Sequence, residues 1–226
     1  MGKRFVEILR FLMHCVMEVI YPSKDECLIC KKLLHGEMML CAYCESRIVH
    51  CKESYVVSKD KLDIVYYSAA YYTDIITELM IRLKYKSDFS SGEVIAGLMT
   101  KVIERESLEV DFITFVPMKR KEIRRRGYNQ SEYLARLISR EVKIPMIKAL
   151  IKGDDSKDQI GLDGLLRWEN LKGCFKAVNT NKINNKKILL VDDVITTGAT
   201  GFYCASELLL KGAKEVTILT GAKSSI

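Results

Sequence analysis

The 226-residue sequence lacks several features that mark common classes of protein. No run reaches the roughly 20 uninterrupted apolar residues that a membrane span needs, so we expect no transmembrane segment. Neither G-x-x-x-x-G-K-[ST] nor a G-x-G-x-x-G after a strand occurs, which excludes two common phosphate-binding loops. Only three prolines and thirteen glycines interrupt the chain. With 48% hydrophobic residues, it is long enough for one sizeable core and a small appendage.

Acidic residues are fewer than basic ones. Lys and Arg number 36 against 29 for Asp and Glu, which gives a formal charge of +7. A surface of this kind favours polyanions without identifying one. If four thiolates bind one Zn²⁺, they add −4 + 2 = −2, and the charge falls from +7 to +5. The basic excess therefore survives metal binding.

The first 22 residues resemble a signal peptide only superficially. Apolar residues recur at helical spacing, but Glu7, Arg10 and Glu18 interrupt them, and no small-residue cleavage site follows. We therefore expect residues 1–22 to form an amphipathic helix that docks on the chain's own core or on a partner. Contact with a membrane surface is the alternative. The expected compartment is the cytoplasm, with the inner membrane as a peripheral contact.

Two C-x-x-C pairs predict a metal centre in residues 23–51, a zinc-ribbon-like module. Its expected ligands are Cys27, Cys30, Cys41 and Cys44. Four thiolates suit tetrahedral Zn²⁺ and leave no open position for water, so the zinc would be structural. Two disulfides are the alternative, which would require an oxidising compartment. The other cysteines have no ligand spacing and are expected to be buried thiols; they are Cys15, Cys51, Cys174 and Cys204.

Strand-like and helix-like patterns alternate in the remaining chain, which we expect to form one domain over residues 52–226. The expected strands are 63–72, 112–116, 145–150, 188–193 and 216–219, and the expected helices are 90–104, 131–142 and 201–211. The polar segment 51–61 is expected to link the two modules. This alternation favours an α/β fold with a parallel sheet and right-handed connections.

The string ILLVDDVITTGAT at residues 188–200 predicts a binding site for a sugar phosphate. Asp192 and Asp193 end an apolar strand, so their carboxylates could accept hydrogen bonds from sugar hydroxyls or help to hold a divalent metal. The small residues that follow open into a helix, whose first N–H groups favour a phosphate. They are Thr196, Thr197, Gly198, Ala199 and Thr200. The alternative is an ordinary strand and turn in which Asp192 caps the next segment.

This string resembles the phosphoribosyl pyrophosphate (PRPP) motif of type I phosphoribosyltransferases. A longer similarity is to the ComF family: VPMKRKEIRRRGYNQSEYLA from Val116, QIGLDGLLRWENLKGCF from Gln159 and LKY from Leu83 follow in family order behind the four cysteines. The resemblance implies a type I phosphoribosyltransferase-like sheet flanked by helices, a zinc ribbon, and PRPP bound with Mg²⁺. Residues 152–158 depart from the family's arginine and threonine, so no role is transferred to that loop.

A basic run lies between the expected strand at 112–116 and the expected helix at 131–142. Its cations are Lys119, Arg120, Lys121, Arg124, Arg125 and Arg126. Mutual repulsion predicts a solvated loop in the absence of an anion. The resemblance implies that the loop approaches pyrophosphate and closes over the ligand. Contact with a nucleic-acid backbone, or a solvated hairpin without a ligand, are the other interpretations.

Three functions follow as hypotheses. ComF resemblance implies a PRPP-binding protein that handles single-stranded DNA during uptake in natural transformation, together with the DNA-uptake machinery. The alternative is a Mg²⁺-dependent phosphoribosyltransferase, in which Asp192 and Asp193 stabilise the ribose while a base or amine displaces pyrophosphate. The third is a PRPP-responsive regulator whose first helix recruits a partner. No acceptor pocket can be assigned, because Tyr85 and Trp168 are expected to be packing residues.

Overall fold

The computed structural model describes residues 26–34, 36, 38–153 and 164–224. The chain divides into two compact units, Met1–Ser46 and Arg47–Ile226. In the first unit, a bridge between Glu26 and Leu33 precedes helix α2 (Ala42–Ser46). The amphipathic helix expected at residues 1–22 lies outside the described residues.

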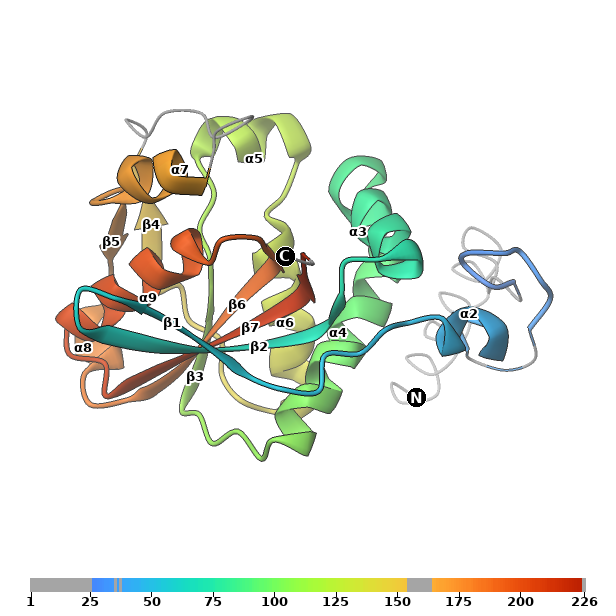
Figure 1. Cartoon of the computed structure of the whole chain (residues 1–226), viewed down its shortest axis with the longest axis horizontal. Helices are drawn as coiled ribbons and strands as arrows, with labels where there is room; N and C mark the ends of the chain where they lie inside the picture. Colours follow the sequence, from blue (N-terminus) through green and yellow to red (C-terminus); the bar gives the residue numbers. More distant parts are fainter. Residues whose placement is uncertain (1–25, 35, 37, 154–163, 225–226) are drawn as a thin grey trace, which may run out of the picture. The chain divides into compact units, whose positions relative to one another are not determined.

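Five strands form the main sheet of the second unit, in the order β1-β2-β7-β6-β3 (Figure 1). They are β1 (Tyr55–Lys59), β2 (Leu62–Tyr71), β3 (Phe112–Phe115), β6 (Lys187–Ile195) and β7 (Glu215–Lys223). Strands β2, β7, β6 and β3 are parallel, which confirms the predicted α/β class. Strand β1 is antiparallel to β2 at the edge, in a segment expected to be a linker. Its residues alternate between half-buried and exposed, so it gives no continuous apolar run.

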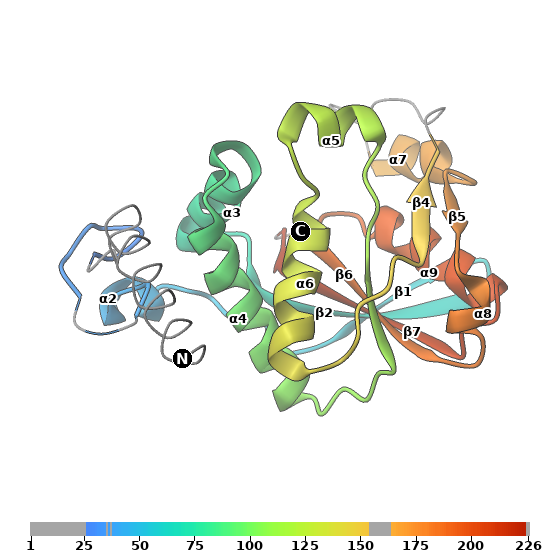
Figure 2. The same ribbon diagram turned by 180° about the vertical axis from the view of Figure 1, so that it is seen from behind.

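Helices cover both faces of this sheet (Figures 1 and 2). Helices α4 (Phe89–Arg105) and α6 (Gln130–Val142) pack on one face, and α9 (Ala199–Leu210) packs on the other. Helix α3 (Asp74–Lys86), which the sequence did not predict, packs on α4, and α7 (Gly164–Leu171) packs on α9. No helix in the described ranges is both long and apolar enough to cross a bilayer.

A small antiparallel sheet and a short helix complete the second unit. Strand β4 (Leu150–Lys152) pairs with β5 (Phe175–Ala177), and α8 (Thr180–Ile183) follows. The strand expected at 145–150 is therefore wrong in extent, because only Met146 bridges to β3, at Ile113. The chain leaves the edge of the main sheet after one bridge and pairs again from Leu150 onward.

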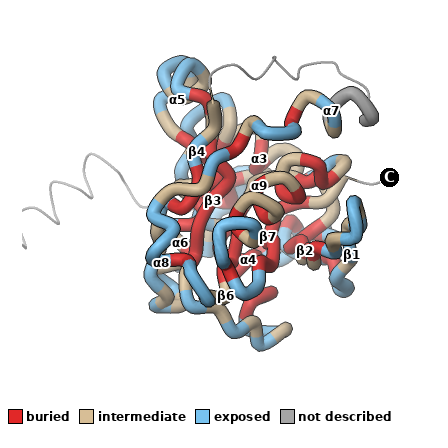
Figure 3. The backbone as a smooth tube through the Cα atoms, turned by 90° about the vertical axis from the view of Figure 1, so that its left-hand side faces the viewer, coloured by how far each residue is buried: buried red, intermediate tan, exposed pale blue. Residues whose placement is uncertain are grey.

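The core lies between the central strands and the helices (Figure 3). Leu189 and Leu190 of β6 are fully buried, as the apolar run predicts for a strand covered on both faces. Helix α9 approaches the sheet closely at Gly201, where an added Cβ would lie 2.9 Å from the Tyr66 hydroxyl and from Ile218 Cδ1. This close contact sets the start of α9 against β2 and β7.

The basic run forms helix α5 (Arg120–Arg126), so the predicted solvated loop is wrong in secondary structure. Glu122 accepts a hydrogen bond from the Lys119 backbone N–H at 3.1 Å. Gly127 ends the helix in the left-handed region, at φ +87°, and donates to the Ile123 carbonyl at 2.7 Å. These local caps outweigh the repulsion between neighbouring cations. Figure 2 shows α5 at the end of two extended connections to β3 and α6.

Candidate functional site

Asp192 and Asp193 lie near the carboxyl end of β6, one strand from the sheet edge formed by β3. The prediction that they end the strand is wrong by two residues, because β6 pairs with β7 as far as Ile195. Helix α9 also begins earlier than expected, at Ala199. The connecting turn is therefore short, and Gly198 makes it possible by adopting φ +80°.

The turn and the first residues of α9 line a cavity of about 60 Å³ together with Asp192. That volume is more than a single water molecule needs, at about 10–15 Å³. Thr196, Thr197 and Thr200 all contribute to its wall. The Tyr66 hydroxyl donates to the Gly198 carbonyl at 2.7 Å and holds the turn in place. The structure thus gathers the predicted residues 196–200 and Asp192 around one cavity.

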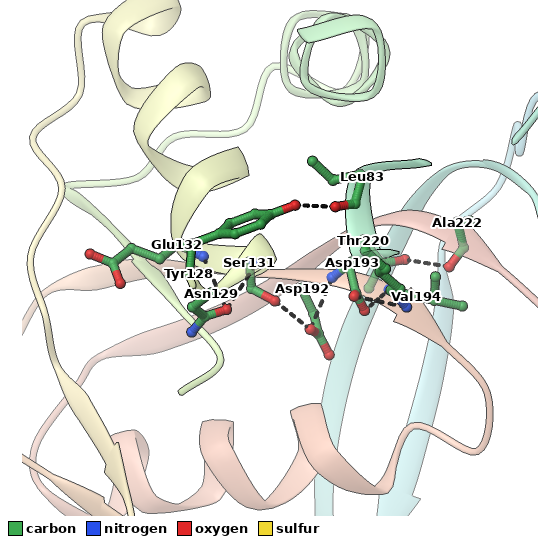
Figure 4. Close-up of polar contacts among 11 residues, drawn as sticks. Leu83, Tyr128, Asn129, Ser131, Glu132, Asp192, Asp193, Val194, Thr220 and Ala222 are labelled. Atoms are coloured by element: carbon green, nitrogen blue, oxygen red, sulfur yellow. Dashed lines mark hydrogen bonds and ion pairs between the residues drawn. The ribbon is translucent and has the colours of Figure 1, made fainter. Parts of the chain in front are cut away.

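Asp192 is a half-buried carboxylate with only part of its hydrogen-bonding capacity used (Figure 4). Its Oδ1 accepts hydrogen bonds from the Ser131 hydroxyl at 2.8 Å and from the Asp193 backbone N–H at 2.9 Å. Its Oδ2 has no hydrogen-bond partner in the described part of the chain. Burial, helped by the charge of Asp193, raises the pKa of Asp192 to about 7. A cation or a hydroxyl at Oδ2 would stabilise the charged form.

Asp193 is paired with a lysine from a distant helix. The Lys84 ammonium, near the end of α3, lies 2.8 Å from Asp193 Oδ2, and the side chains are 20% and 16% exposed. Burial by itself lowers the pKa of Lys84, but the carboxylates of Asp193 and Asp192 outweigh it, so the net shift is upward. The Tyr128 hydroxyl donates to the carbonyl of Leu83 and so ties this end of α3 to the start of α6. The acidic pair therefore has a built-in counter-ion.

The four cysteines of the first unit converge as the C-x-x-C spacing predicts. The sulfur atoms of Cys27, Cys30, Cys41 and Cys44 all lie within 4.8 Å of one another. None of the described cysteines forms a disulfide. The backbone N–H of Cys41 donates to Cys27 Sγ at 3.4 Å, and that of Cys44 donates to Cys41 Sγ at 3.4 Å. Such N–H to sulfur bonds orient thiolate ligands, so this donor set fits a metal such as Zn²⁺.

The cluster holds its thiols at unequal pKa values. Burial opposes ionisation of Cys27, but backbone N–H groups outweigh it and lower the pKa of that thiol. Burial and the neighbouring cysteines raise the pKa of Cys44. The Cys27 thiolate therefore forms readily, while Cys44 resists ionisation until a cation compensates its charge, as expected of a metal site. His35 and His50 are the histidines near the four cysteines in sequence and could substitute as ligands; His35 lies outside the described residues, and the exposed His50 belongs to the second unit, where it bridges to Ala70.

Known proteins resemble this chain over nearly its whole length. It is 28% identical over 218 residues to Competence protein F of Haemophilus influenzae, a match that spans 91% of this chain and 93% of that protein. It is also 27% identical to DNA utilization protein YhgH of Escherichia coli over 90% of this chain and 92% of that protein. Competence protein ComFC of Bacillus subtilis is 24% identical over 86% of this chain and 82% of that protein. These matches confirm the resemblance that the motifs indicate.

Solved structures resemble part of this chain. The allosteric regulatory enzyme of purine biosynthesis matches 58% of this chain and 26% of its own, with 23% identity and a TM-score of 0.42. Adenine phosphoribosyltransferase from Thermoanaerobacter pseudethanolicus matches 62% of this chain and 83% of its own, with 11% identity and a TM-score of 0.39. No family model matches the chain.

The other predicted residues are distributed over several regions of the chain. The basic run lies on α5, where Arg120, Lys121, Arg124 and Arg125 are exposed. Tyr85 is 73% exposed, so its expected packing role is wrong; the Arg126 guanidinium carbon lies 5.5 Å from its ring centre. Trp168 packs as expected, with ring centres 5.3 Å from Phe202 and 5.7 Å from Tyr203. Residues 154–158 of the divergent loop lie outside the described residues.

Three residues of the site were missed at the level of sequence. Lys84 and Ser131 reach the acidic pair directly, and Asn129 positions Ser131. The Asn129 amide donates to the Val116 carbonyl at 2.9 Å, and its oxygen accepts from the Ser131 N–H at 3.0 Å at the start of α6. All three lie in the LKY and GYNQS segments of the family matches, which is the signal that could have identified them.

Proposed function

We propose that this chain binds PRPP or a related phosphoribosyl ligand together with Mg²⁺, and that it handles single-stranded DNA during DNA uptake. The observation that carries the ligand proposal is the cavity in which helix N–H groups, threonine hydroxyls and Asp192 converge. Helix N–H groups and hydroxyls bind phosphate, and carboxylates accept hydrogen bonds from ribose hydroxyls. The relatives named for competence and DNA utilization support the DNA role.

Asp192 and Asp193 are the residues that would hold Mg²⁺ with the ligand, directly or through water. Bound Mg²⁺ neutralises the charge of pyrophosphate. The Lys84 ammonium forms an ion pair with Asp193 Oδ2. It therefore lies close enough to the acidic pair to contact an anion bound there. We place the protein in the cytoplasm, the compartment in which free thiols persist, with the inner membrane as a peripheral contact. The four-cysteine cluster would bind Zn²⁺ as a structural metal.

Isothermal titration of the full chain with PRPP and Mg²⁺ should give saturable heat. Replacing Ser131 with Ala should weaken this binding about 3- to 10-fold, about 0.6–1.4 kcal/mol, because Asp192 loses the hydroxyl that orients it. Ser139→Ala is the matched control, since that hydroxyl bonds to the Ile144 carbonyl at the far end of α6. Absence of saturable heat from the wild type would refute the ligand proposal. Pyrophosphate release on addition of a base or amine would instead establish turnover.

The α5 cations are expected to contact the phosphates of a single strand. Replacing Arg124, Arg125 and Arg126 with Gln should weaken binding of oligo(dT) and reduce the slope of log K against log salt by about 2. Fluorescence anisotropy over a range of KCl concentrations measures both the affinity and the salt slope. Lys176, Lys182 and Lys211, replaced together by Gln, remove the same charge from other exposed positions. Equal slopes for the two triple variants would eliminate α5 as the specific contact.

A further inference from the structure

A groove of about 510 Å³ is lined by residues of α4, α5 and α6, and it is distinct from the cavity beside Asp192. We call it the aromatic groove. Its wall includes Phe89, Ile123, Tyr128, Tyr133, Arg136 and Arg140. The mechanism proposed above for the phosphoribosyl ligand uses none of these side chains at the acidic pair.

Three aromatic rings form a fixed cluster in this groove. The ring centre of Phe89 lies 4.9 Å from that of Tyr133 and 5.3 Å from that of Tyr128. The Tyr133 hydroxyl donates to the Phe89 carbonyl at 3.3 Å, and the Tyr128 hydroxyl donates to Leu83. Gly92 admits Tyr133 against α4, because a Cβ there would lie 2.6 Å from the Tyr133 ring. The rings are thus held in place before any ligand arrives.

Packing alone does not account for the exposure of these aromatics. Phe89 is 46% exposed at the start of α4, and Tyr85 is 73% exposed near the end of α3. Tyr85 is not in the groove wall, but the Arg126 guanidinium carbon lies 5.5 Å from its ring centre, and Arg126 precedes Gly127 of that wall. An exposed aromatic costs hydration free energy unless something covers it. Two such residues on one side of the domain indicate a contact surface.

Charges of both signs surround the groove: the carboxylates of Asp88 and Glu93 act on its tyrosines, and cations lie in its wall and on α5. Arg136 and Arg140 lie in its wall, and Ile123 brings the exposed arginines of α5 to its border. One acid in the wall, Glu132, is paired with Arg136 at 3.3 Å. Aromatic faces flanked by cations bind single-stranded nucleic acid, since bases stack on the rings and the cations follow the backbone. The flanking charge makes a purely apolar partner helix the poorer fit.

We propose that single-stranded nucleic acid lies in the aromatic groove, with bases stacked on Phe89 and Tyr85 and phosphates beside Arg140 and α5. The inference rests on the proposed handling of single-stranded DNA and gives that function its contact surface. Stacking carries no sequence code, because every base has a ring face. Binding should therefore tolerate any base sequence.

The test is anisotropy of a labelled oligo(dT) with the full chain and its variants. Phe89→Ala and Tyr85→Ala should each weaken binding by about tenfold without changing the salt slope, because stacking neutralises no phosphate. Arg140→Gln should lower that slope by about 0.7. Leu210→Ala removes a side chain that is 76% exposed on α9, and it should bind like the wild type.

An abasic strand separates stacking from a general structural effect. The wild type should bind it more weakly than oligo(dT), and Phe89→Ala should add little further loss on that strand. If the Phe89→Ala and Tyr85→Ala variants bind oligo(dT) like the wild type, the aromatic groove is not the DNA contact. That result would favour a protein as its occupant. A wild type that binds no strand at low salt would instead refute the DNA-handling function itself. Titration of the same variants with PRPP should be unchanged.

Discussion

Asp192→Asn is expected to raise the melting temperature of the ligand-free protein while it weakens phosphoribosyl binding. The raised pKa of Asp192 means that the folded state holds this proton more tightly than the unfolded chain does. Its carboxylate therefore reduces stability progressively as pH rises from about 4 to about 7. Asn keeps the acceptor oxygen for Ser131 and removes the charge. At pH 8 the variant should melt about 2–4 °C higher, the shift that about 1 kcal/mol produces at this size, and at pH 4 the two should coincide.

Asp193→Asn should change stability in the opposite direction. Its carboxylate compensates Lys84, which is only 20% exposed, so the variant leaves a buried ammonium without its ion pair. The loss should be about 1–2 kcal/mol, less than the about 3–5 kcal/mol of a fully buried pair because both groups keep some solvent contact. Calorimetric melting of both variants at pH 8 shows directly whether each melting temperature lies above or below that of the wild type.

Both substitutions should weaken PRPP binding in the presence of Mg²⁺, by about 10- to 100-fold each, since each removes a charged acceptor. Asp63→Asn, an exposed change on β2, should alter neither stability nor binding and serves as the matched control. Equal stability effects from Asp192→Asn and Asp193→Asn would contradict the unequal environments of the two carboxylates. Unchanged PRPP affinity in both variants would show that the acidic pair does not contact the ligand.

The sequence predicted those parts of the fold that depend on local pattern. The apolar run before Asp192 is a central strand because both of its faces are covered, and a run of that kind needs no partner to be identified. Strand β1 was not predicted because only alternate residues of this edge strand are half-buried, and the others are exposed. Helix α5 was not predicted because the repulsion among its cations favours a loop. Hydrogen bonds at Glu122 and Gly127, at the two ends of the helix, outweigh that repulsion.

The site could be predicted only along one stretch of chain. Asp192 and residues 196–200 are neighbours in sequence, and the structure places them around one cavity. Lys84 reaches Asp193 from α3, and Ser131 reaches Asp192 from α6, across 193 − 84 = 109 and 192 − 131 = 61 positions of sequence. No local pattern encodes such contacts, because they depend on how the helices pack over the sheet.

Removing one cysteine of the cluster is expected to unfold the first unit and leave the second intact. Between residues 26 and 46 the buried apolar side chains other than cysteine are Leu28, Leu34 and Leu40. Three leucines cannot offset the conformational entropy of ordering this segment, whereas a structural zinc contributes about 10–16 kcal/mol. Cys44→Ser should therefore lower bound zinc from one per chain to none. Trypsin cleavage after the exposed Lys31 and Lys32 should accelerate by at least about tenfold, as the open state becomes the main one.

Cys174→Ser is the control for the loss of a thiol, because Cys174 lies outside the cluster and a serine hydroxyl can replace its bond to the Asn170 carbonyl. It should retain zinc and protease resistance. The melting transition of the sheet unit should persist in Cys44→Ser, since the main core lies in residues 47–226. If the cysteine variant kept its resistance without metal, the thiols would be packing residues and the unit would owe its order to another contact. Restored resistance on adding Zn²⁺ to a chelated wild type would exclude that outcome.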